Sequence, residues 1–180
     1  MKKHPAIAVV EFAEIPTGMS ATDAMLKKAP IAFVKCGTIT RGRYLTLIGG
    51  TTASVDEALR EGLAQGGQGV LDHLLLADVH PRLYEAILGW RKPGGAGALA
   101  IVETDTVAAS VRAAEAALKG TPVDLIEIRL ADTGLSGKGV SVYQGTLSDI
   151  EAAIEIATRY VDQTGTGLRY RAISAPHEGL

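Results

Sequence analysis

The sequence of 180 residues predicts an α+β protein in which one domain occurs twice in tandem. Three observations predict this fold class: an internal repeat, alternating strand and helix patterns, and a segment rich in Gly and Pro between the repeats. Residues 6–11 match residues 98–103, an offset of 92, and Gly50-Thr51 matches Gly145-Thr146, an offset of 95. Because the matches keep one order, we expect a first domain at 1–90, a linker at 91–97 and a second domain at 98–180.

Each repeat opens with a strand and a helix. Short apolar runs rich in β-branched residues predict buried strands at 6–12 and 98–103. An apolar spacing typical of one helix face follows each strand, and Pro30 and Pro122 mark the helix ends. The predicted core-facing residues are Ile15, Met19, Thr22 and Leu26 in the first repeat, and Val107, Val111, Ala114 and Leu118 in the second.

Two strands, a second helix and a last strand complete each repeat. The predicted strands are 31–39, 43–49 and 70–78, then 123–131, 138–144 and 167–174. Thr51 and Thr146 follow turn glycines and are predicted to cap the second helices. Pro81 begins a short extra helix over 81–88. The order β-α-β-β-α-β, present twice, predicts two ferredoxin-like domains.

Composition narrows the classes of function. The chain has 18 basic and 20 acidic residues and 4% aromatic residues, which disfavours nucleic acid as a partner. No apolar run approaches the length of a membrane span, so we expect no membrane partner. The single cysteine, Cys36, excludes an internal disulfide and fits a reducing cytosol. We expect Cys36 to be buried or half-buried at a strand end, and Trp90 to order part of the linker by avoiding water.

Catalytic and metal-binding motifs are weak. No nucleophile elbow, phosphate-binding loop or dinucleotide fingerprint is present, and the histidines lack metal-type spacing. Glu11 and Glu103 occupy equivalent strand ends, but no second catalytic group accompanies either carboxylate. We therefore expect no enzyme activity, metal or cofactor. A small-molecule-sensing oligomer and an unrecognised enzyme stay open as alternatives to a structural protein.

Several short sequences, in one order and twice over, resemble a known family. They are Val10-Glu11 and Val102-Glu103, Asp23 to Lys27, Leu118-Lys119, Gly42-Arg43 and Gly137-Lys138, and the corners His80-Pro81 and Pro176-His177. Together they resemble the tandem-domain, trimer-forming shell proteins of bacterial microcompartments, in the unpermuted arrangement. This resemblance implies a homotrimeric, pseudohexagonal shell tile with a central pore. It also implies a cytoplasmic location in the microcompartment shell, beside hexameric and pentameric shell proteins.

The resemblance also implies site residues. The pore would be lined by Thr38, Ile39, Thr40, Arg41 and Gly42 from one loop, and by Asp132, Thr133, Gly134, Leu135, Ser136 and Gly137 from the other. The tile edges would be contacted by Lys27, Lys119, His80 and His177. Because Arg43 and Lys138 can point back to brace the loops, we expect Arg41 at the pore wall, where it would favour anionic or polar metabolites. The rival interpretation is that Arg41 folds onto Asp132 and leaves a neutral ring.

Two departures from the family pattern limit what the resemblance implies. Family members often carry an edge arginine at the positions of Asp78 and Ala175, so the edge contacts here must differ. Members from propanediol compartments carry a pore-loop cysteine that holds an iron–sulfur cluster, and the matching residue here is Thr40. Since thiolates are the usual cluster ligands, we expect no cluster.

Overall fold

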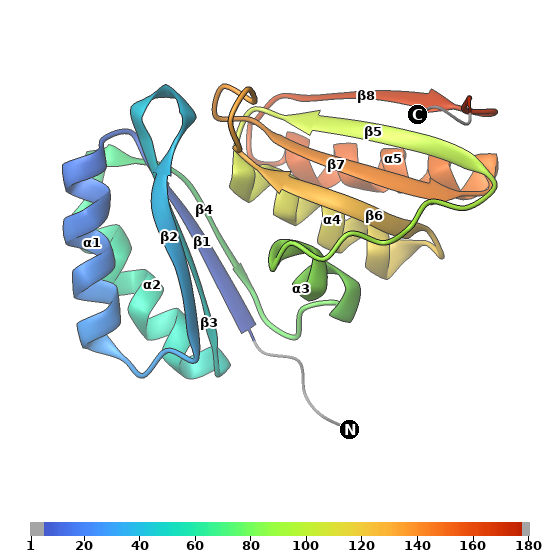
Figure 1. Ribbon diagram of the computed structural model, residues 1–180. Helices are drawn as coiled ribbons and strands as arrows, with labels where there is room; N and C mark the ends of the chain where they lie inside the picture. Colours follow the sequence, from blue (N-terminus) through green and yellow to red (C-terminus); the bar gives the residue numbers. More distant parts are fainter. Residues whose placement is uncertain (1–5, 178–180) are drawn as a thin grey trace. The chain divides into compact units, whose positions relative to one another are not determined.

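The computed structural model describes residues 6–177, which form two compact units. The first unit holds the described residues up to Val79 together with Asp132–Gly137. The second holds His80–Ala131 and the described residues from Lys138 onward. Each unit contains one four-stranded antiparallel sheet covered by helices (Figure 1).

The first unit is built from four strands, two long helices and short 3₁₀ turns. Its sheet has the strand order β2-β3-β1-β4, so the first strand lies in the middle. The alanines of β1, with Val10 and Phe12, pack against residues of both long helices and form an apolar core. The elements are β1 (Ala6–Phe12), α1 (Ile15–Lys28), β2 (Phe33–Ile39), the 3₁₀ turn Thr40–Gly42, β3 (Arg43–Gly50), α2 (Thr52–Gly66) and β4 (Val70–Leu76).

The second unit repeats this plan with one addition. Its sheet has the equivalent order β6-β7-β5-β8. A short helix precedes the repeat and packs against β6 and α4. The elements are α3 (Pro81–Ile87), β5 (Ala98–Thr104), α4 (Val107–Gly120), β6 (Asp124–Leu130), β7 (Gly139–Gly145), α5 (Leu147–Asp162) and β8 (Leu168–Ile173).

The predicted order β-α-β-β-α-β is confirmed in both repeats, and so are both helix caps. Thr51 Oγ1 accepts a hydrogen bond from the Ser54 N–H at 3.2 Å, and Thr146 Oγ1 accepts one from the Asp149 N–H at 3.2 Å. Each threonine satisfies a main-chain donor that the first helical turn leaves without a partner. The extra helix over 81–88 is also confirmed, although its contacts place it in the second unit.

The predicted core face of α1 is half right: Thr22 is buried and Ile15 packs against the core, but Met19 and Leu26 do not face it. Met19 is 57% exposed and Leu26 is 41% exposed, whereas Gly18, Ala21 and Met25 are buried. Small residues turn this face toward the sheet, because a side chain at Gly18 would place its Cβ 2.5 Å from the Tyr44 Cβ. Close approach at glycine and alanine, rather than side-chain size, therefore sets the rotation of this helix.

Cys36 also departs from the expectation. It is exposed and lies within β2, not at a strand end. Its thiol hydrogen-bonds the Tyr44 hydroxyl, and this bond together with burial raises the pKa of Tyr44 to about 12. The phenol thus stays protonated over the whole physiological range and serves as a packing residue against α1.

Residues 6–177 contain no helix that is both long enough and apolar enough to cross a bilayer.

Candidate functional site

The β2–β3 loop carries the first set of predicted pore residues. Arg41 and Gly42 both have positive φ angles, 70° and 69°, and both are exposed. Two successive left-handed residues turn the chain sharply at the tip of the hairpin. Thr38 is also exposed, while Ile39 and Thr40 are half-buried at the base of the tip.

The loop Asp132–Gly137 carries the second set and groups with the first unit. Gly134, Ser136 and Gly137 have positive φ angles, and the Leu135 N–H bonds the Asp132 carbonyl at 3.0 Å. Asp132, Thr133, Gly134 and Ser136 are exposed, Leu135 is half-buried and Gly137 is buried.

A direct hydrogen bond joins the two loops. The Gly137 N–H donates to Thr40 Oγ1 at 2.7 Å. Gly137 also lies against Arg43, since a Cβ at Gly137 would stand 3.0 Å from its guanidinium nitrogen. The loops that the sequence assigned to one site are therefore brought together, although they are far apart in the chain. Thr40, where relatives were expected to carry a cluster-binding cysteine, takes part in this contact.

Strand-end glutamates brace the base of each loop. Arg43 Nη1 lies 4.0 Å from Oε2 of the fully buried Glu11. At the equivalent place in the second repeat, Lys138 Nζ lies 2.6 Å from Glu103 Oε1. Arg169 adds a third cation 3.7 Å from the same Glu103 oxygen. This arrangement agrees with the expectation that Arg43 and Lys138 point back into the protein.

Sequence reasoning missed the role of these two glutamates. It considered Glu11 and Glu103 as catalytic carboxylates, whereas each is the anionic partner of a loop-base cation. One feature of the sequence could have indicated these pairs: Glu11 and Glu103 occupy equivalent positions in the two repeats, and so do Arg43 and Lys138. Their pairing depends on β1 lying beside β3 and β5 beside β7, which the linear sequence does not display.

The predicted edge lysines each have an acidic partner one helical turn earlier. Lys27 Nζ lies 2.6 Å from Asp23, and both side chains are largely exposed. Lys119 Nζ lies 2.6 Å from Glu115, whose side chain is buried. Glu115 also accepts a hydrogen bond from the His80 N–H, at 3.1 Å to one of its oxygens. The two equivalent lysines therefore have unequal surroundings.

The predicted edge histidines also differ. His80 is half-buried and caps α3, since its Nδ1 accepts a hydrogen bond from the Arg82 N–H at 3.2 Å. His177 is exposed beyond the end of β8. Within residues 6–177 the structure groups no three side chains of the kind that hold a metal ion.

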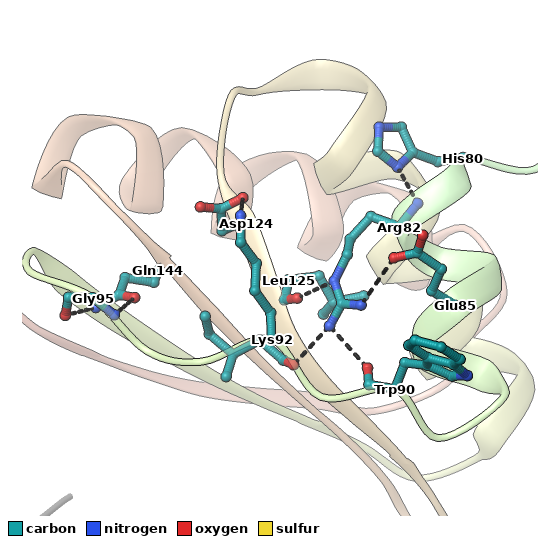
Figure 2. Close-up of polar contacts among 10 residues, drawn as sticks. His80, Arg82, Glu85, Trp90, Lys92, Gly95, Asp124, Leu125 and Gln144 are labelled. Atoms are coloured by element: carbon teal, nitrogen blue, oxygen red, sulfur yellow. Dashed lines mark hydrogen bonds and ion pairs between the residues drawn. The ribbon is translucent and has the colours of Figure 1, made fainter.

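Arg82 anchors the linker and was missed by sequence reasoning. Figure 2 shows its guanidinium directed at main-chain carbonyls: Nε bonds Leu125 at 2.7 Å, and Nη2 bonds Ile126 at 2.8 Å and Trp90 at 3.0 Å. Nη1 also lies 3.3 Å from Glu85. Because Leu125 and Ile126 belong to β6, one side chain ties α3 and the start of the linker to an edge strand.

The linker is ordered through its main chain, and not through Trp90 as expected. The Trp90 side chain is 69% exposed. The Lys92 N–H bonds the Ile126 carbonyl at 2.8 Å, and the Lys92 ammonium contacts Asp124 at 2.5 Å. Gly95 exchanges two hydrogen bonds with the Gln144 side-chain amide (Figure 2).

Equivalent surfaces of the two repeats differ in burial. On the sheet face away from the helices, Val9 and Leu47 are fully buried in the first unit. Their counterparts in the second unit, Ile101 and Val142, are only half-buried. The first helices show the reverse. Val111 and Leu118 of α4 are buried, whereas their counterparts on α1, Met19 and Leu26, are exposed.

Comparison with known proteins gives one consistent group. The BMC domain family matches residues 6–82 and 98–176. The chain is 34% identical to the bacterial microcompartment shell protein PduT of Citrobacter freundii, over 97% of this chain and 95% of that one. It is 26% identical to the carboxysome assembly protein CcmO of Synechococcus elongatus, over 97% of this chain and 67% of that one.

Solved structures agree. A microcompartment protein from Desulfitobacterium hafniense superposes with a TM-score of 0.84 at 31% identity, over 98% of this chain and 97% of that one. A fused permuted hexameric shell protein from the RMM microcompartment has a TM-score of 0.64 at 20% identity, over 89% and 85% of the two chains. The second likeness concerns the fold alone.

Proposed function

The chain belongs to the BMC domain family of bacterial microcompartment shell proteins, and we propose that it is a shell tile in which three copies close a pseudohexagonal plate around a pore. These relatives are named as shell and assembly proteins, not as enzymes. That favours the tile over both alternatives, a small-molecule sensor and an enzyme. As a shell component, the tile would work in the cytoplasm beside hexameric and pentameric shell proteins.

The observation that supports the proposed trimer is that equivalent surfaces of the two repeats are buried to different extents. Each chain leaves one helix stripe exposed, at Met19 and Leu26, and one sheet face open, at Ile101 and Val142. The equivalent residues of the other repeat are buried: Val111 and Leu118 on α4, and Val9 and Leu47 on the first sheet. If the open face of one copy covers the stripe of the next, the contact is head to tail, and it gives a ring when the rotation between neighbouring copies closes after three of them. Three chains with two domains each would then give six positions.

The two joined loops supply the proposed pore. Their exposed tips carry Arg41, Asp132 and Thr133, and each would occur three times around the axis. Arg43 and Lys138 are already paired with glutamates, so they are held below the tips. The charged side chains that remain at the tips are then Arg41 and Asp132, and we assign Arg41 to the pore wall.

Two measurements test the tile directly. Native mass spectrometry of the purified protein is expected to give three times the chain mass. Electron microscopy at modest concentration is expected to show sheets or tubes. A stable monomer in solution would exclude the ring, and a trimer that never assembles further would favour the sensor.

The charge of the pore can be reversed at one position. In shells assembled with Arg41→Glu, we expect the flux ratio of a small carboxylate to a small amine of equal size to fall by about tenfold, because a ring of three cations becomes a ring of three anions. Arg41→Gln should give an intermediate ratio. Equal ratios in the parent and both variants would mean that Arg41 does not set selectivity.

The edge lysines give a second prediction, with different costs at the two positions. Lys27→Ala should change the free energy of unfolding by less than about 0.5 kcal/mol, because it removes an exposed ion pair. Lys119→Ala should cost about 1–2 kcal/mol, because it leaves the buried Glu115 carboxylate without its ammonium partner. Thermal unfolding measures both costs.

Assembly is the separate readout for the edge role. Both variants should remain trimeric by native mass spectrometry, yet form fewer or smaller sheets in electron micrographs. The exposed pair Arg159–Glu155 on α5 offers a matched control, Arg159→Ala. Sheets as extensive as those of the parent, in both lysine variants, would remove these residues from the tile edge.

A further inference from the structure

A groove of about 630 Å³ lies between α5 and β8 in the second unit. None of its residues belongs to the loops, to the predicted edge set or to the linker. Ile154 is buried and Thr158 half-buried at its floor, and the other lining residues are exposed around them. The lining residues are Ile154, Thr158 and Ala172, then Glu151, Glu155, Arg159, Asp162 and Tyr170.

The first repeat shows that the fold does not require this groove. At the offset of 95, Thr158 corresponds to Leu63, and at the offset of 97, Ala172 corresponds to Leu75. The strand alignment is secure, because Leu75 pairs with Ala8 and Ala172 pairs with its equivalent, Ala100. Leu63 and Leu75 pack onto the core of the first unit. Replacement of two leucines by threonine and alanine opens the corresponding space in the second unit.

The rim of the groove is acidic. Glu151, Glu155 and Asp162 contribute three carboxylates against one guanidinium, that of Arg159, for a net charge of −2. Arg159 is already engaged, with Nη2 at 2.7 Å from Glu155. Asp162 is the last residue of α5, where the carbonyl end of the helix adds negative potential. The groove therefore attracts cations and repels anions.

Two further side chains extend the range of contacts. Tyr170 is half-exposed beside the carboxylates, and its ring can stack on an alkylammonium or guanidinium group. Thr158 Oγ1 is buried and has no hydrogen-bond partner among the described residues. A ligand donor that reached the floor would satisfy this oxygen.

We propose that the α5–β8 groove binds a small organic cation, an ammonium or guanidinium compound with a short apolar stem. The cation lies between Tyr170 and the Asp162 carboxylate, toward the C-terminal end of α5. The stem lies on Ile154 and Ala172, in the space that leucines fill in the first repeat. This assignment does not depend on the trimer or on the pore, since every lining residue belongs to one unit.

Three probes with one stem and different head groups test the proposal: n-butylammonium, n-butanol and n-butyrate. The protein carries ¹³C-labelled methyl groups on isoleucine and alanine, so that Ile154 and Ala172 report binding by NMR. We expect saturable shifts at both methyl groups with n-butylammonium, at least about tenfold weaker binding of n-butanol, and none of n-butyrate. Equal binding of n-butanol and n-butylammonium would overturn the proposal, and so would an absence of shifts at both residues.

A second set of variants distinguishes binding in the groove from attraction to surface charge, and the first pair introduces the leucines that the first repeat has at the equivalent positions. Thr158→Leu with Ala172→Leu should fill the groove, keep the parent melting temperature and weaken n-butylammonium binding by at least about tenfold. Asp162→Asn should weaken binding by about threefold. Asp56→Asn, the same loss of charge on α2 of the first unit, should leave binding unchanged. Undiminished binding to the leucine-filled variant would place the ligand elsewhere.

Discussion

Leu26→Asp is expected to convert the trimer into monomers. In the proposed ring, the exposed stripe of α1 is covered by the open sheet face of the next copy, so a carboxylate at residue 26 would be buried without a partner. Such burial costs about 3 kcal/mol or more, which raises the dissociation constant of the contact at least about a hundredfold. Ile101→Asp, on the opposite side of the same contact, should have the same effect.

Leu147→Asp is the matched control. Leu147 is 43% exposed, nearly the same as Leu26, but lies in the first turn of α5, where an acidic side chain is favoured by the helix dipole. Native mass spectrometry and light scattering at several protein concentrations measure the oligomer. If Leu26→Asp and Ile101→Asp remained trimeric at the lowest concentration at which the parent does, the head-to-tail contact would be wrong.

Arg82→Ala should produce the largest loss of folding stability. Its side chain is mostly buried and donates to three main-chain carbonyls, those of Leu125, Ile126 and Trp90. Truncation leaves these acceptors and α3 without their common donor, at a cost of about 3 kcal/mol. For a chain of this length that corresponds to a fall in melting temperature of about 6–12 °C at fixed protein concentration.

Arg82→Lys should recover less than half of this loss. An ammonium group cannot reproduce the planar fork that serves three acceptors at once. Arg60→Ala is the matched control, because Arg60 is an exposed arginine paired with Asp56 on the surface of α2, and its loss should change stability little. Equal melting temperatures for Arg82→Ala and Arg60→Ala would show that the Arg82 hydrogen bonds contribute nothing measurable.

The sequence predicted what local patterns determine. The order of strands and helices, the caps at Thr51 and Thr146, and the extra helix at Pro81 all follow from short-range signals, and the structure has all of them. The two loops could also be located, because glycines and turn residues interrupt the strand patterns on both sides.

Local patterns could not predict which surface covers an apolar helix face or side chain. The apolar spacing of α1 is real, but Met19 and Leu26 are not covered within the chain, while Gly18 and Ala21 are. A hydrophobic pattern shows that a surface is apolar and does not say whether the chain itself or another copy buries it. The expectation for Trp90 was wrong for the same reason: a large apolar side chain favours burial, but Trp90 is exposed within the chain.

Pairings between distant residues were also beyond the sequence. Glu11 with Arg43, and Arg82 with the carbonyls of β6, require strands and helices to be placed first. The repeat offered a partial guide, since equivalent residues tend to share a role. Yet Lys27 and Lys119 show its limit, because one faces an exposed acid and the other a buried one.

The left-handed backbone at Arg41 restricts how this tip can evolve. With φ at 70°, residue 41 tolerates Gly, Asn or Asp at little cost, whereas Val or Ile would be strained by about 1–2 kcal/mol. The glutamate braces end just below the tip, so exchange of residue 41 within the tolerated set leaves the sheet untouched. In the proposed tile, a single substitution at residue 41 would therefore change which molecules cross the shell and leave the lattice intact, and the residues that it tolerates are few and mostly polar.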